Sequence, residues 1–139
     1  MNSMTILIVE DQSRDRLLLR AILEAEGHAI LEAGGGHEAL ALLESTPVDA
    51  IISDIFMPRM DGYRFCRELR ASTRLGGLPF IFYSAMFTEP SHQKLGLEAG
   101  ADGYLTKPAE VPVILQALAD ARQKAALRRG TDKPVALPA

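Results

Sequence analysis

The sequence predicts an α/β protein in which a doubly wound, five-stranded parallel sheet lies between two layers of helices. Short apolar runs alternate along the chain with longer segments of helical period, as in βα units that feed a parallel sheet. The first run, residues 5–9, is continuously apolar, which is typical of a strand that helices cover on both faces. Right-handed crossovers restrict such units to a doubly wound, three-layer sandwich.

Each predicted strand ends just before a polar or turn-forming residue. The predicted strands cover residues 5–9, 28–33, 50–53, 80–83 and 103–106. In open parallel sheets, ligands bind at the carboxyl ends of the strands, near the switch in strand order. The residues that follow these five runs are therefore the candidates for function.

Helical periodicity predicts the connecting segments. The predicted helices cover residues 13–26, 37–45, 62–71, 89–99 and a last segment from about 112. Gly27 stops the first helix, and Pro112 is acceptable in the first turn of the last one. The fourth is the weakest and is expected to be the most mobile, because Gly96 interrupts it. Gly34, Gly35 and Gly36 are expected to form a flexible loop, since they lack the spacing of a phosphate cradle.

Composition places the chain among soluble, single-domain proteins. The length of 139 residues suits one domain, which we assign to residues 4–125, with a helix end and a flexible tail over 126–139. The net charge of −3 gives no reason to expect direct nucleic-acid binding. No apolar stretch reaches the ~20 residues that cross a bilayer, so no membrane contact is expected. Cys66 is the only cysteine and is expected in the core, which favours a reducing, cytoplasmic setting.

Acids, a hydroxyl and a cation follow the predicted strands. They are Glu10 and Asp11 after the first strand, Asp54 after the third, Ser84 after the fourth and Lys107 after the fifth. Carboxylates in close proximity repel unless a divalent cation neutralises them, and oxygen ligands at an open site favour Mg²⁺. Asp54 beside Mg²⁺ is then a candidate nucleophile for a phosphoryl group. Lys107 would stabilise the phosphoryl charge while Ser84 donates a hydrogen bond.

These residues lie in motifs that resemble the receiver domains of two-component response regulators, over residues 5–124. The motifs are Glu10-Asp11, the segment Asp54-Ile55-Phe56-Met57-Pro58-Arg59-Met60-Asp61-Gly62, Ser84-Ala85, Gly100-Ala101-Asp102-Gly103-Tyr104 and Lys107-Pro108. All five in this order make the resemblance specific. It implies the flavodoxin-like strand order 2-1-3-4-5.

The resemblance also implies a chemistry. A sensor histidine kinase or phosphotransfer protein would phosphorylate Asp54, with Asp11 and Asp54 as direct Mg²⁺ ligands. Glu10 would reach the metal through water, and the Phe56 carbonyl would complete the protein ligands. Lys107 and Pro108 resemble the family's cis peptide.

The same resemblance implies a conformational switch. Ser84 and Tyr104 would report phosphorylation to a surface formed by the fourth helix, fifth strand and fifth helix, where two copies would pair or a partner would bind. Ala85 is a further site position beside Ser84. Phe56 and Met86, each two residues beyond a site residue, are bulky and apolar, and predict a long-lived phosphoryl group.

Several alternatives remain open. Asp54 could cap a turn, and Tyr104 could be an ordinary core or edge aromatic. A phosphatase of the haloacid-dehalogenase type would need an Asp-x-Asp pattern after the first strand, where Glu10 and Asp11 stand instead. A flavodoxin would need a phosphate-binding first loop, which two acids oppose. A degenerate receiver would depart at the central positions, and this sequence departs at none.

Overall fold

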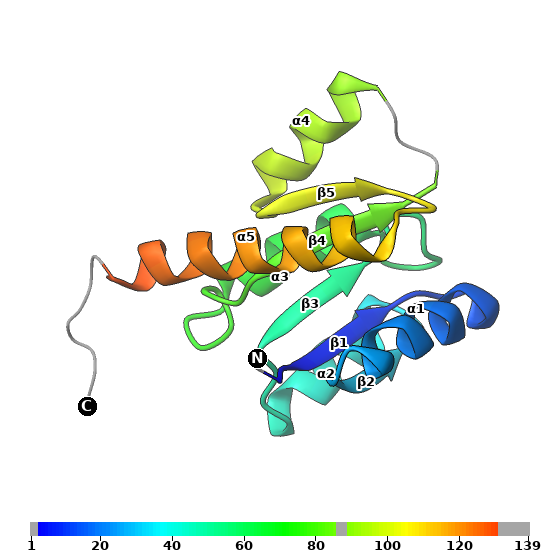
Figure 1. The fold of residues 1–139 in the computed structure, drawn as a ribbon. Helices are drawn as coiled ribbons and strands as arrows, with labels where there is room; N and C mark the ends of the chain where they lie inside the picture. Colours follow the sequence, from blue (N-terminus) through cyan, green and yellow to red (C-terminus); the bar gives the residue numbers. More distant parts are fainter. Residues whose placement is uncertain (1–2, 86–88, 131–139) are drawn as a thin grey trace.

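The computed structural model describes residues 3–85 and 89–130 and confirms the predicted sandwich (Figure 1). Met86 and the tail from residue 131 lie outside this part. The strands are β1 (Thr5–Val9), β2 (Ala29–Ala33), β3 (Ala50–Ser53), β4 (Phe80–Ser84) and β5 (Gly103–Thr106). The helices are α1 (Ser13–Ala25), α2 (Gly36–Ser45), α3 (Gly62–Ala71), α4 (Pro90–Ala99) and α5 (Val111–Gly130). The strands pair in parallel in the order β2-β1-β3-β4-β5, as expected.

Two separate cores hold the helices against the sheet. On one face, α1 and α5 pack through Leu23 and Leu118, and on the other face α2 and α3 pack through Leu43 and Phe65. Figure 1 shows α1 and α5 in front of the sheet and α2 and α3 behind it. All four side chains are almost completely buried, and each such side chain contributes about 1.5–3 kcal/mol by leaving water.

Backbone contacts explain where the elements end. Gly27 has a φ of +92°, and its N–H donates to the carbonyl of Glu24, which closes α1 as predicted. β2 then begins one residue later than predicted, because His28 still donates its N–H to Leu23 at the end of α1. β4 extends through Ser84, which pairs with Thr106 of β5, so Ser84 ends the strand and does not follow it. α2 starts at Gly36, which therefore belongs to the helix and not to the predicted loop.

Gly96 allows α4 to lie close to the sheet. A Cβ atom at this position would come within 3.1 Å of the Phe82 ring and 3.6 Å of the Tyr104 ring. The glycine was interpreted from the sequence as a weakness of the helix, but it is buried at the contact between α4 and the sheet. The greater mobility of α4 stays a prediction.

Two cationic side chains near the end of α5 bind backbone carbonyls of other segments. Lys124 donates to the carbonyl oxygen of Asp102 at 2.8 Å, and Arg129 donates to the carbonyl of Gly77 at 3.2 Å. These contacts attach the last turns of α5 to the loops before β4 and β5. Among the helices of the described residues, none combines the length and the apolarity needed to cross a membrane.

Candidate functional site

The predicted acids meet at the carboxyl edge of the sheet, toward which the strand arrows point in Figure 1. β1 and β3 are neighbours, so Glu10 and Asp11 lie beside Asp54. One carboxylate oxygen from each of these three residues lies within 4.8 Å of the others. The strand order thus explains why residues more than forty positions apart in the printed sequence form one acidic cluster.

Glu10 is the most buried member of the cluster, with a relative exposure of 4%. Its Oε2 accepts a hydrogen bond from the backbone N–H of Gln12 at 2.9 Å, and its Oε1 contacts Lys107. Burial raises the pKa of Glu10 to about 7, although the bonds from Lys107 and Gln12 act in the opposite direction. Crowding of carboxylates in a partly dry site is the arrangement that a divalent cation relieves.

Asp54 is held by its own backbone and remains partly accessible. Its N–H donates to Val9 at 2.9 Å, which continues the pairing of β3 with β1 by one residue. Its Oδ1 accepts from the N–H of Ile55 at 2.6 Å, and its Oδ2 lies 3.3 Å from the Nζ of Lys107. The side chain is 12% exposed. Asp54 therefore has a fixed orientation and an open approach.

Lys107 links the cluster to the end of β5. Its Nζ contacts Glu10, lies 3.1 Å from Asp15 and 3.3 Å from Asp54, and sits 5.7 Å from the centroid of the Tyr83 ring. Burial would lower the pKa of Lys107, but the hydrogen bond to Glu10 and the charge of Asp54 outweigh it and raise that pKa. Lys107 thus stays an ammonium ion.

The bond between Lys107 and Pro108 is cis, as predicted. The N–H of Lys107 donates to the carbonyl of Ser84 at 3.0 Å, and the N–H of Ala109 donates to the hydroxyl of Tyr83 at 3.0 Å. The turn after β5 is therefore attached to the end of β4 on both sides of Pro108. These bonds fix the backbone from which the Lys107 side chain reaches the acids.

Ser84 has a buried hydroxyl with no hydrogen-bond partner among the described residues, and its relative exposure is 1%. Strand alternation places its side chain on the same face as Phe82 and Tyr104, which pair with each other in register. Tyr104 packs against the core under α3 and α4, and burial raises its pKa to about 12. Buried polar groups are almost always bonded, so the Ser84 hydroxyl is suited to a ligand of the site.

The remaining predicted positions surround the cluster. Ala85 and Pro108 line a cavity of about 290 Å³ beside Asp54, which apolar side chains of α1, among them Leu18, also line. The Phe56 side chain is 50% exposed and follows Asp54 by two residues in the β3–α3 connection. Ligation of a metal by the Phe56 carbonyl stays a prediction.

Sequence reasoning missed two residues that contact Lys107. Asp15 lies in the first turn of α1, and Tyr83 lies in β4 just before Ser84. Asp15 carried no signal in the sequence, because Asp11 lies before α1 and no helical spacing connects the two acids. Tyr83 carried no polar pattern that would have separated it from an ordinary strand aromatic.

The residues present fit a divalent cation. Glu10, Asp11 and Asp54 offer only oxygen atoms, in a group whose negative charge Lys107 balances only in part. Hard ions such as Mg²⁺ take such ligands together with water. Carboxylates from β1 and β3 would hold the ion, while Ser84 and Lys107 face the same edge from β4 and β5.

Comparison with known proteins agrees with this geometry. A family model of the response regulator receiver domain matches residues 6–119. The response regulator MprA of Mycolicibacterium vanbaalenii is 40% identical over 126 residues, which cover 91% of this chain and 51% of that protein. The chain spans about half the length of the curated relatives it matches.

Solved structures give the same result. A putative response regulator from Chloroflexus aurantiacus has a TM-score of 0.83 at 30% identity, covering 88% of this chain and 99% of that one. The receiver domain of sensor histidine kinase PA1611 from Pseudomonas aeruginosa has a TM-score of 0.79 at 28% identity, with 88% and 99% covered, and a magnesium ion coordinated in its active site cleft. Sequence, fold and acidic cluster agree, and the chain belongs to the response regulator receiver domains of two-component signal transduction.

Proposed function

We propose that this chain accepts a phosphoryl group on Asp54 from a phosphohistidine of a sensor kinase or phosphotransfer protein. The observation that carries this proposal is the convergence of three carboxylates and Lys107 on one edge of the sheet, with one oxygen of each acid within 4.8 Å of the others. Asp54 combines a fixed carboxylate with partial exposure, as an attacking group needs. Glu10 is buried too deeply for that role.

In this proposal Asp11 and Asp54 bind Mg²⁺ directly, Glu10 binds it through water and the Phe56 carbonyl completes the protein ligands. The bound cation would neutralise the acids and the oxygens of the incoming phosphoryl group. The buried Ser84 hydroxyl supports the proposal, because it would gain the acceptor that it lacks among the described residues.

The transfer forms one bond to phosphorus and breaks another. An oxygen of Asp54 attacks phosphorus, the P–N bond of the phosphohistidine breaks, and the imidazole leaves with the electron pair and takes up a proton. Lys107 stabilises the phosphoryl oxygens with its ammonium group, and Ser84 donates a hydrogen bond to one of them. The product is an acyl phosphate on the chain itself, so the protein acts as a switch that carries one phosphoryl group and not as a turnover enzyme.

The switch would run from Ser84 to Tyr104. Movement of Ser84 toward the phosphoryl oxygens would vacate space on the face that it shares with Phe82 and Tyr104, and the Tyr104 ring would turn inward to fill it. The surface of α4, β5 and α5 would change shape and favour a homodimer or an output partner. We place this signalling in the cytoplasm, in line with the single buried Cys66.

The phosphoacceptor role is tested by intact mass after incubation with acetyl phosphate. One phosphoryl group should appear with Mg²⁺ and not without it, and Asp54→Asn should remove the signal. Asp120→Asn, an exposed change on α5, is the control and should behave like the parent. An undiminished signal in Asp54→Asn would reject the assignment, and steady hydrolysis of a generic phosphate ester would favour the phosphatase alternative.

The switch is tested with Ser84→Ala and Tyr104→Ala. NMR shifts and sedimentation with and without a phosphoryl mimic should show a weakened response at α4, β5 and α5 in both variants. A response equal to that of the parent in both would reject this route.

A further inference from the structure

We propose that Asp15 is a positioning residue that restrains Lys107 and slows phosphorylation by free anionic donors. This inference rests on the proposed function of Asp54. Asp15 lies outside the acidic cluster of Glu10, Asp11 and Asp54, yet its Oδ2 is 3.1 Å from the Nζ of Lys107. Asp15 is therefore a further carboxylate at the site, paired with the lysine that the proposed transfer uses.

All three N–H donors of the Lys107 ammonium group have carboxylate partners. An ammonium group has three N–H donors, and the Nζ of Lys107 contacts three carboxylates, those of Glu10, Asp15 and Asp54. Phosphoryl oxygens can receive a hydrogen bond from Lys107 only if one of these contacts is given up. Asp15 therefore competes with the incoming group for the same ammonium ion.

Metal binding leaves this competition in place. A cation bound by Asp11 and Asp54, and by Glu10 through water, would offset the charges of Asp54 and Glu10, so the attraction of these two carboxylates for Lys107 would fall. Asp15 is 44% exposed on α1 and lies outside the cluster, so the cation would not share its carboxylate. In the metal-loaded site the Asp15 carboxylate would therefore still hold Lys107, and its charge beside the position of the phosphoryl oxygens would repel an anionic donor.

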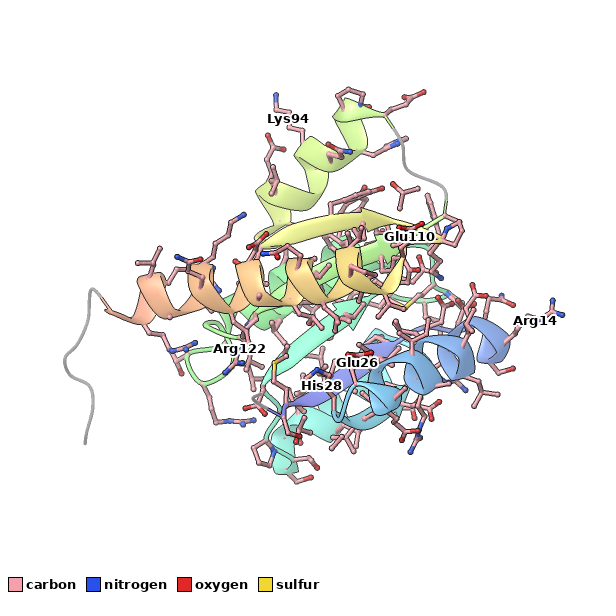
Figure 2. The ribbon with its side chains drawn as sticks, viewed as in Figure 1. Arg14, Glu26, His28, Lys94, Glu110 and Arg122 are labelled. Atoms are coloured by element: carbon pink, nitrogen blue, oxygen red, sulfur yellow. The ribbon has the colours of Figure 1, made fainter. Side chains whose placement is uncertain are left out.

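The surroundings of Asp15 support this role. Figure 2 shows Arg14, the preceding residue, pointing away from the protein at the start of α1, so its cation does not lie between Asp15 and Lys107. The cavity beside Asp54 is lined by Asp15, Leu18 and Lys107, so a donor that enters there passes the Asp15 carboxylate. A protein donor with a basic side chain opposite Asp15 would neutralise it. Asp15 would thus select such a donor over a small free anion.

The experiment compares phosphorylation rates of the full chain at saturating Mg²⁺. Asp15→Asn keeps the size and one acceptor but removes the charge, and should raise the rate constant per molar acetyl phosphate by roughly three- to tenfold at low salt. The gain should shrink near 1 M salt, where the Debye length is ~3 Å, and the part that comes from the released Lys107 contact should remain. The gain should also be smaller with phosphoramidate, which carries less negative charge. Asp15→Glu should restore the slow rate of the parent.

Glu26→Gln is the matched control, since it removes one carboxylate from the opposite end of the same helix (Figure 2). It should leave the rate unchanged. An Asp15→Asn rate equal to or below that of the parent, or an equal gain in Glu26→Gln, would overturn the proposal.

A binding measurement separates this inference from the function of Asp54. Inorganic phosphate, titrated in the presence of Mg²⁺ and followed by the amide shifts of Ser84 and Lys107, should bind several-fold more tightly to Asp15→Asn. If the parent takes no phosphoryl group but phosphate binding still tightens, the phosphoacceptor function fails and the role of Asp15 stands. Unchanged phosphate binding would reject the role of Asp15 whatever happens at Asp54.

Discussion

Replacement of Asp102 should destabilise the fold from the end of the sheet opposite to Asp54. Asp102 lies just before β5 with a side chain that is 3% exposed. Its Oδ2 accepts from the N–H of Phe80 at 3.0 Å and from Arg70 at 3.1 Å, and its Oδ1 contacts Arg128. One carboxylate thus joins the starts of β4 and β5 to α3 and α5.

The expected loss in the free energy of unfolding follows from the groups that lose a partner in Asp102→Ala. The N–H of Phe80 loses its acceptor, which costs about 1–3 kcal/mol when the group is buried. Arg70, whose side chain is 16% exposed, loses its counter-charge, and breaking a buried pair costs about 3–5 kcal/mol in all. Arg70 keeps its bonds to the carbonyls of Gly100 and Gly76, and Arg128 is 39% exposed, so we expect the lower end, about 3 kcal/mol.

Urea unfolding followed by far-UV circular dichroism measures this loss. With a denaturant slope of about 2 kcal/mol per molar, the midpoint should fall by roughly 1.5 M. Asp102→Asn keeps an acceptor and should lose less, and Asp120→Ala on the exposed side of α5 should change the midpoint little. A loss below about 1 kcal/mol in Asp102→Ala would refute the reasoning, because the network would then contribute no more than a surface ion pair.

Two further predictions concern the approach to the site and acid stability. Gly62→Ala should cost about 1–3 kcal/mol in urea unfolding, because its Cβ would lie 2.4 Å from the backbone oxygen of Asp54, whereas Gly35→Ala, in open space, should be nearly neutral. A hydrogen bond from Arg20 is the main cause that lowers the pKa of Glu32. Because this folded-state pKa is lower than the unfolded one, the stability from Glu32 is present above the unfolded pKa and is lost as the pH falls through the folded one. Glu32→Gln should therefore narrow the drop in melting temperature between pH 7 and pH 3, and an equal drop in both proteins would contradict the assignment.

The sheet was predictable because its signals are local. The run from Thr5 to Val9 is apolar enough to specify a buried strand by itself, and Gly27 specifies its own helix end through a left-handed φ. The sequence was least informative where a distant partner determines the structure. Ser84 belongs to β4 because it pairs with Thr106, and Gly96 suits α4 because the Phe82 ring lies beneath it. Neither partner can be inferred from the residues that flank the position.

The site was predictable to the extent that strand order determines it. Parallel strands bring their carboxyl ends together whatever the side chains, so Glu10 and Asp54 could be placed side by side from the sequence. Asp15 could not, because its distance from Lys107 depends on how α1 lies across the sheet. Asp102 carried a motif but no assigned role, since its partner Arg70 is 32 residues away and no periodicity connects the two.

The difference between Asp54 and Asp102 shows what marks a functional carboxylate in this fold. Asp54 directly follows a strand and Asp102 directly precedes one, and each contacts a basic side chain. Residue type and position therefore do not distinguish the functional carboxylate from the structural one. Asp102 is surrounded by two arginines and a backbone donor, which balance its charge and leave no reason for a ligand. Asp54 shares one lysine with two other acids, and Ser84 at the end of β4 has a buried hydroxyl that lacks a partner among the described residues. A cation would offset the excess negative charge, and a phosphoryl group would accept a hydrogen bond from the unused donor. This arrangement occurs at the carboxyl ends of β1 and β3, the two strands between which the strand order reverses.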